Sequence, residues 1–357
     1  MSAIDGILLI ILAGLAGYAL LGGADFGGGV WDLLARGPRK RRQRDLIATA
    51  IGPVWEANHV WLIFVIIALF SGFPIAFGAL ARGLHLPLAL ALVGIVLRGA
   101  AFVFRQYGDG DPDSRPVAGT RLWGRVFAVA STLTPVMLGV CGAAVATGRI
   151  STQPTLAIFH GWFTIIVGAL TLVICAYLSA VYLCHEAHHR GHPDLADDFR
   201  RYALGAAVAA GALALAALPA LRHDAPTVWD RLFADGWPAL GLSAAGGFAS
   251  IAALTARRYL AARVAAAGAT LGVLAGWALA QYPYLIPPPP DGSAPDGVAD
   301  LTAADAAAPA ATLPITLGVL LIGFALTIPA LLLLFRMTSP SPPRQDGTAH
   351  ETRQNRP

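Results

Sequence analysis

Nine long apolar segments follow one another along this chain, and they constrain its fold more than any other feature. A helix needs about 20 apolar residues to cross the hydrocarbon core of a bilayer. Such unbroken runs argue against a closed β-barrel, whose strands alternate apolar and polar residues over about ten positions. The sequence therefore predicts an all-α polytopic membrane protein with about nine transmembrane helices. The expected spans lie near residues 5–34, 47–71, 75–104, 122–147, 155–184, 203–221, 238–256, 260–282 and 312–335.

The composition agrees with this class. Of the 357 residues, 56% are hydrophobic and 13% charged, whereas soluble domains carry about 25% charged residues. Residues 1–336 are expected to form a single integral membrane domain, followed by a disordered cytoplasmic tail over 337–357. The proline-rich stretch Pro287–Pro309 is also expected to be unstructured. The N-terminus, MSAIDG, lacks the basic region of a signal peptide, so the first apolar run is expected to remain as a span.

Basic residues are shared unevenly between the loops. If the loops alternate sides, 20 of the 25 Lys and Arg residues fall on one side of the membrane. Cytoplasmic loops carry the excess of basic residues in membrane proteins, so the N-terminus is predicted to lie outside and the C-terminus in the cytoplasm. The net charge of +4 reflects this topology, and nucleic acid is not an expected partner.

Two carboxylates stand inside the first two expected spans. Asp25 lies 11 residues before Arg36, and Glu56 lies 12 residues after Arg44. At 1.5 Å per residue both should lie roughly 16–18 Å from the loop that joins the two helices. Acids at matched depth on adjacent helices predict a proton-conducting polar pocket, in which burial and mutual repulsion disfavour ionisation. The alternative for Asp25 is a plain helix cap.

Two further ionisable residues extend this candidate site. His59 follows Glu56 by three residues and could bond to it or relay a proton near neutral pH; the alternative is a satisfied interface histidine. Arg98 lies seven residues before Arg105, roughly 10 Å above the helix end. A buried arginine needs a partner, and Glu56 or Asp25 is the expected one; the alternative is snorkelling.

Three residues near Glu56 are predicted to have structural or interface roles: Trp55, Asn58 and Trp61. Trp55 and Asn58 flank the helix face on which Glu56 and His59 lie.

A short metal-binding pattern competes with this interpretation. His185-Glu186-Ala187-His188-His189 fits H-E-x-x-H, in which two histidines one turn apart bind zinc and the glutamate is the base. The pattern is expected just past the fifth span, in a basic loop, rather than inside a span. It nevertheless keeps an intramembrane zinc protease, with His185, Glu186 and His189 as its site, among the hypotheses. A proton-coupled carrier that uses the same carboxylates is another.

Several stretches resemble subunit II of the cytochrome bd-type quinol oxidases, over the full length of the chain. They are GADFGGGVWDLL in the first span, IGPVWEANHVWL in the second, LRGAAFVFR in the third, AVYLCHEA at the end of the fifth and QYPYLIPP after the eighth. AVYLCHEA is more typical of the cyanide-insensitive branch.

The resemblance implies a subunit of a respiratory quinol:oxygen oxidoreductase in the bacterial inner membrane. Its fold would be two four-helix bundles plus one peripheral helix. Subunit I would hold the quinol site, two b-type haems and one d-type haem. This chain would ligate no haem or metal and hold no catalytic residue, although some members bind a structural quinone. A small accessory subunit is a further expected partner.

By the same resemblance, the acids of subunit II help to bring cytoplasmic protons toward those haems. Carried over by motif, Asp25, Glu56 and Arg98 are expected to take part in proton transfer, and Trp55, Glu56 and Asn58 match the W-D-x-N element of the family. His59 joins the expected proton-transfer residues because of its position beside Glu56. The chain departs from the family pattern at four positions. Glu56 replaces the usual aspartate, Ala57 a glycine, His59 a Gln or Glu, and Ala24 a larger residue. Glutamate keeps the acid but lengthens its arm by one methylene.

Overall fold

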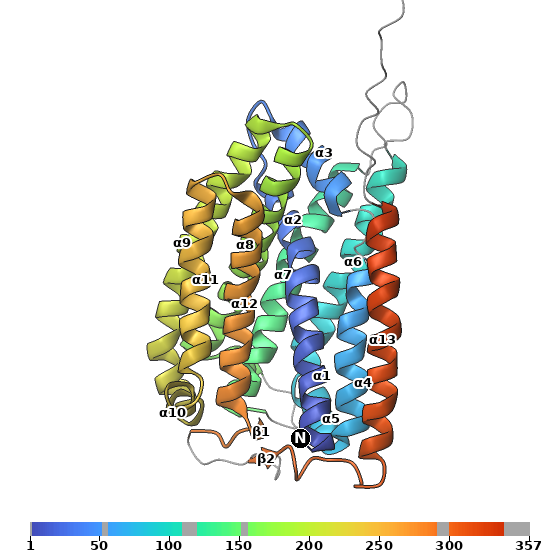
Figure 1. Cartoon of the computed structure of the whole chain (residues 1–357), viewed down its shortest axis with the longest axis vertical. Coiled ribbons are helices and arrows are strands. Elements are labelled where there is room, and N and C mark those ends of the chain that lie inside the picture. Colours follow the sequence, from blue (N-terminus) through green and yellow to red (C-terminus); the bar gives the residue numbers. More distant parts are fainter. Residues whose placement is uncertain (1, 52–55, 109–119, 151–155, 291–299, 339–357) are drawn as a thin grey trace, which may run out of the picture.

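The computed structural model describes residues 2–51, 56–108, 120–150, 156–290 and 300–338. Most of them lie in long helices packed side by side (Figure 1). In chain order the helices are α1 (Ala3–Gly17), α2 (Gly23–Leu34), α3 (Lys40–Ile51), α4 (Val60–Gly72), α5 (Pro74–Gly83), α6 (His85–Gly108), α7 (Thr120–Thr147), α8 (Trp162–His189), α9 (Pro193–Asp224), α10 (Pro226–Ala234), α11 (Trp237–Thr255), α12 (Tyr259–Gln281) and α13 (Leu313–Thr338). The shorter elements are the π-helical turn η1 (Tyr18–Gly22), the 3₁₀ turns η2 (Ala57–His59) and η3 (Leu156–Phe159), and the strands β1 (Tyr284–Ile286) and β2 (Leu301–Thr302).

The all-α polytopic fold is confirmed. Within the described ranges, eight helices are long and apolar enough to cross a membrane, with α1, η1 and α2 forming one of them. The shorter apolar helix Ala57–Gly72 falls where the second of the nine expected spans was predicted.

The two ends of the helix array differ in character (Figure 1). Helix α3 lies at one end, called the α3 end below, together with the end of α6 and the start of α9. The N-terminus and strands β1 and β2 lie at the other, the β end. The basic residues of α3 therefore gather opposite the N-terminus, as the alternating topology predicts. Which end faces the cytoplasm stays a prediction.

Helices α7 and α8 form the centre of the fold. Their most apolar stretches are 61% and 56% buried within the chain, whereas that of α13 is only 11% buried. Helix α8 packs against α2, α7, α9 and α12, and α13 packs against α1 and α4. The low burial of α13 agrees with a peripheral helix, while the division of the others into two four-helix bundles stays a prediction.

Several predicted boundaries were wrong. The basic loop after the first span contains helix α3, and the expected loop after the fifth span is almost entirely helical. Helix α8 continues to His189 and α9 begins at Pro193, ten residues before the expected span. Proline at the first helical position and Asp194 in the first turn both favour this early start. The single span expected over 75–104 is two helices, α5 and α6, which meet at Leu84.

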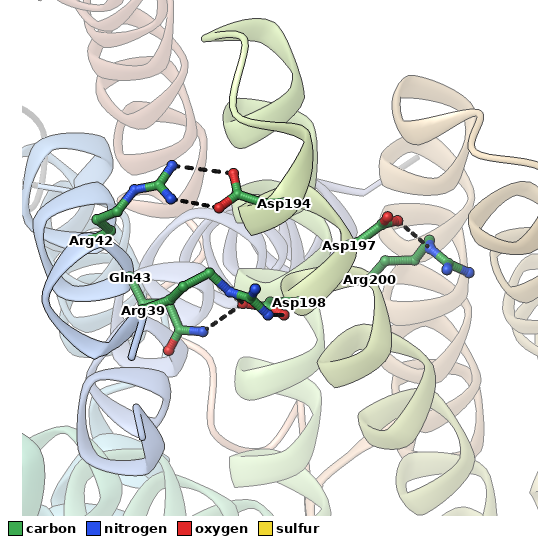
Figure 2. Close-up of polar contacts among 7 residues, drawn as sticks. All are labelled: Arg39, Arg42, Gln43, Asp194, Asp197, Asp198 and Arg200. Atoms are coloured by element: carbon green, nitrogen blue, oxygen red, sulfur yellow. Dashed lines mark hydrogen bonds and ion pairs between the residues drawn. The ribbon is translucent and has the colours of Figure 1, made fainter. Parts of the chain in front are cut away.

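Ion pairs hold α3 against the start of α9 (Figure 2). Arg39 donates to both carboxylate oxygens of Asp198 at 2.7 and 2.6 Å, and Gln43 donates to the same carboxylate at 3.0 Å. Arg42 donates to Asp194 at 2.5 and 3.2 Å. The hydrogen bonds that Arg39 donates to Asp198, together with the negative charge of that carboxylate, raise the pKa of Arg39. These contacts join residues more than 150 positions apart, so no local sequence pattern reveals them.

Replacing Asp198 by asparagine is expected to destabilise the protein by about 1–3 kcal/mol, because it weakens three hydrogen bonds to a buried charged group. Asp194→Asn is the matched control. Its ion pair is more exposed, with side-chain exposures of 51% for Arg42 and 39% for Asp194, so its loss should cost only about 0–1 kcal/mol. Thermal unfolding of the purified variants measures both changes. Equal shifts in Tm would contradict the assigned difference.

The β end contains more regular structure than expected. Strand β1 pairs antiparallel with β2, with Tyr284 opposite Thr302. Arg231 donates to the Tyr282 carbonyl, and its guanidinium lies 5.4 Å from the centre of the Tyr284 ring. The prediction of an unstructured Pro287–Pro309 was therefore wrong where β2 lies, while residues 291–299 are outside the described ranges.

Candidate functional site

Helix α2 lies against α7 and α8 at distances that only glycine allows. A Cβ atom on Gly27 would stand 2.0 Å from the carbonyl oxygen of Cys175, and one on Gly29 would stand 2.2 Å from Ser131 Oγ. Small residues let membrane helices approach this closely. The glycine-rich run therefore serves packing, and Asp25, which precedes it, is buried with 6% of its surface exposed.

A π-helical turn stands immediately before this acid. It covers Tyr18–Gly22, and such turns occur often at functional sites. Tyr18 is buried; its ring meets that of Phe26 edge-on at 6.2 Å, and its hydroxyl lies 3.4 Å from Nδ1 of His59. Hydropathy gave no sign of this turn, because the apolar run continues through it unbroken.

The partner of Asp25 is an amide rather than a second acid. Asn58 Nδ2 donates a hydrogen bond to Asp25 Oδ2, and Asn58 is 2% exposed. This bond engages the Asp25 carboxylate with another helix, so the helix-cap alternative does not account for the residue. Asp25 and Glu56 were expected to share one polar pocket, and the contact that Asp25 makes is with Asn58.

Glu56 itself is exposed on the isolated chain, at the start of the η2 turn. A 3₁₀ turn advances about 120° per residue, so side chains two positions apart point to different sides. The equal depth of Asp25 and Glu56 was therefore not enough to predict which residue contacts Asp25. Asn58 faces Asp25, and Glu56 does not. Trp55 lies outside the described residues.

Arg98 is buried beside this pair, with 3% of its surface exposed, so it does not snorkel. Its guanidinium carbon lies 5.0 Å from the Phe26 ring centre and 5.5 Å from that of Phe127. Cation–ring contacts of this kind stabilise a desolvated arginine. Arg98 attracts Asp25 electrostatically, but within the described part of the chain it forms no ion pair, with Glu56 or any other acid. Asp25, one of the two expected partners, thus lies near Arg98 but not in direct contact with it.

The aromatic and imidazole groups complete the pocket. The His59 ring lies 5.9 Å from the Tyr18 ring and 6.4 Å from the Phe26 ring. Trp61, two residues further on, is buried and packs edge-on against Phe324 at 5.6 Å. His59 therefore lies beside the Asp25–Asn58 pair, and Trp61 packs next to it, while its role around a proton pathway stays a prediction.

A second polar cluster at the α3 end was missed by the sequence reasoning. Arg105 donates to both carboxylate oxygens of Asp32 at 3.3 and 3.2 Å. Arg44 lies 3.6 Å from the same carboxylate and donates to the Asp32 carbonyl at 3.1 and 2.9 Å. Asp32 is 2% exposed. Its position seven residues after Asp25, on the same helix face, was the signal that could have revealed it.

The H-E-x-x-H pattern lies within the last turns of α8, not in a loop after it. The rings of His185 and His189 are nearly parallel, 6.4 Å apart, and Arg190 binds Glu186 at 2.6 Å. Across the described ranges, no three His, Cys, Asp or Glu side chains come together in a way that could hold a metal ion. Glu186, which would act as the base, is instead ion-paired with Arg190.

The geometry is thus that of a buried acid with an amide donor, a nearby cation and a nearby imidazole, set inside membrane-spanning helices. Such a group can take up and release a proton, because the amide fixes one carboxylate oxygen and leaves the other available. Ionisable residues placed inside membrane spans are typical of proton relays.

Known proteins are similar to this chain in sequence and in fold. The family model for cytochrome bd terminal oxidase subunit II matches residues 5–338. The chain is 33% identical over 141 residues to cytochrome bd ubiquinol oxidase subunit 2 of Bacillus subtilis (strain 168), an alignment that covers 39% of each protein. It is 29% identical over 139 residues to cytochrome bd-I ubiquinol oxidase subunit 2 of Escherichia coli (strain K12), covering 38% of this chain and 32% of that relative. The structure of bd oxidase from Geobacillus thermodenitrificans contains a chain of the same fold, with a TM-score of 0.73 at 21% identity, covering 94% of this chain and 98% of that one.

Proposed function

This chain belongs to the cytochrome bd terminal oxidase subunit II family, and we propose that it is the second subunit of an oxidase that couples quinol oxidation to reduction of dioxygen to water. The match over residues 5–338 carries this proposal. The chain is a multi-pass protein of the bacterial inner membrane, with its α3 end in the cytoplasm by the positive-inside rule.

The partner is a haem-bearing subunit I, which would hold the b-type and d-type haems and the site of quinol oxidation. A structural quinone within this chain and a small accessory subunit are further parts of the proposal. The side chains of this chain supply proton chemistry rather than haem ligation, so electron transfer belongs to the partner.

The proton route begins at the α3 end and passes through Asp25. Asn58 Nδ2 donates to Asp25 Oδ2, which leaves Oδ1 as the atom that takes up and releases the proton. Arg98 compensates the negative charge of the ionised carboxyl inside the membrane. His59, 3.4 Å from the Tyr18 hydroxyl, is a second group able to carry a proton near neutral pH.

Glu56 is proposed to extend this route toward the partner subunit. Its side chain is exposed on the isolated chain, and an ionisable group near the membrane interior is costly in lipid. Cover by subunit I would remove that cost. The same contact would allow the carboxylate to pass protons across the subunit interface.

Glu56→Gln is expected to impair oxygen-linked proton uptake while the complex still assembles. The amide keeps the size of the carboxyl group but cannot take up and release a proton. Glu186→Gln is the control and should leave proton uptake unchanged. Glu186 is ion-paired with Arg190 at the α3 end, and no proton role is proposed for it. Unchanged turnover and unchanged generation of membrane potential in Glu56→Gln would rule out the proposed role.

Purification through a tag on this chain tests the oxidase assignment as a whole. The expected result is a complex with a haem-bearing partner whose reduced-minus-oxidised spectrum shows b-type and d-type bands. A chain that is isolated alone and still moves a solute would favour the carrier. Stoichiometric zinc that is lost in His185→Ala would favour the protease.

A further inference from the structure

Asp32 joins three helices through one buried carboxylate. It belongs to α2, its carboxylate binds Arg105 of α6 at 3.3 and 3.2 Å, and Arg44 of α3 lies 3.6 Å away. Two hydrogen bonds from one guanidinium to one carboxylate fix direction as well as distance. This contact is therefore able to set the position of α6 along α2.

The spacing on the two helices is equal. Asp32 follows Asp25 by seven residues, and Arg105 follows Arg98 by seven. Both helices run toward the α3 end (Figure 1), and seven residues advance a helix by about 10.5 Å, or two turns. Asp32 and Arg105 thus lie at one level of the two helices, and Asp25 and Arg98 lie two turns away at a second level, near each other but not ion-paired.

Within the part of the chain that the structure describes, Arg98 has no directional contact of its own. Among described residues its Nε atom has no hydrogen-bond partner, and its guanidinium lies over the rings of Phe26 and Phe127. Phe127 separates the two levels, because Arg105 lies 5.3 Å from the same ring. Cation–ring contacts are less directional than bidentate bonds, so they fix the level of Arg98 less firmly.

From these contacts we infer that Asp32 is a positioning residue for proton transfer: it holds Arg105, and through α6 it keeps Arg98 level with Asp25. The inference rests on the proposed function, in which Asp25 carries the proton. Asp32 is not itself a carrier, because two arginines keep its carboxylate engaged. Asp32 therefore affects turnover only by keeping Arg98 in position beside Asp25.

A double-mutant cycle separates this role from a merely structural one. Turnover is measured per haem in the purified complex, so that loss of assembly does not enter the comparison. Asp32→Asn is expected to lower quinol-driven oxygen consumption on the order of tenfold, because misplacing a group by about an ångström costs a step one to two orders of magnitude. Combined with Asp25→Asn, it should cause no further loss, since both changes affect one step.

Two more variants keep the test decisive. Asp32→Glu retains the carboxylate and should restore turnover to between the Asp32→Asn and parent values. Asp198→Asn breaks the other ion-paired anchor of α3 and should leave turnover per haem unchanged.

Additive losses in the double variant, or failure of both Asp32 variants to assemble, would overturn the positioning role. If Asp25→Asn alone had no effect, the proposed function would fail first, and the two failures are thereby distinguished.

Discussion

Asp25→Asn is expected to leave the complex assembled and to slow quinol-driven oxygen consumption by about 100-fold or more, the usual contribution of a positioned acid–base group. The substituted amide keeps the shape of the carboxyl and can still accept the hydrogen bond from Asn58. It cannot take up a proton at Oδ1. The measurement is oxygen consumption per haem in the purified complex with excess quinol.

Asp45→Asn is the control for this change. It removes the same charge from an exposed position on α3, where no proton role is proposed, and turnover should stay at the parent value. Full activity in Asp25→Asn would remove Asp25 from the route, whatever the control shows.

Arg98→Met is expected to have the largest effect on stability. The residue is 3% exposed, and its removal takes away two buried cation–ring contacts, which stabilise by about 2 kcal/mol, together with the charge that compensates Asp25. Membranes that carry this variant should contain little assembled, haem-bearing complex. Thermal unfolding of the surviving fraction should show a lowered Tm.

A second variant shows whether the loss comes from charge or from packing. In Asp25→Asn/Arg98→Met both charges are absent, so assembly should recover in part. Arg82→Met is the control at an exposed position of α5 and should assemble normally. A double variant no better than Arg98→Met would assign the loss to the Phe26 and Phe127 contacts instead.

The spans could be predicted because hydropathy is a local property of the sequence. Helix ends set by distant contacts could not. The early start of α9 depends on local helix-start chemistry at Pro193, but its position against α3 depends on Asp194 and Asp198, whose arginine partners lie more than 150 residues away. Such pairing leaves no periodic signal in either segment.

The candidate site could also be predicted only in part, because its contacts depend on side-chain directions that the sequence does not show. Helical rise gave the depth of Asp25 and Glu56 but not the direction of their side chains. The 3₁₀ turn that directs Asn58 toward Asp25 departs from the helix geometry assumed in that estimate. Asp32 and Arg105 were overlooked because each looks like an ordinary charge at a helix end.

Proton uptake by the complex in sealed vesicles tests the central claim most directly. With the α3 end facing the pH-indicating medium, the parent complex should take up protons from that side during oxygen reduction. Asp25→Asn should reduce this uptake in proportion to its turnover. Proton uptake from the opposite side, or uptake that persists undiminished in Asp25→Asn, would contradict a route from the α3 end through Asp25.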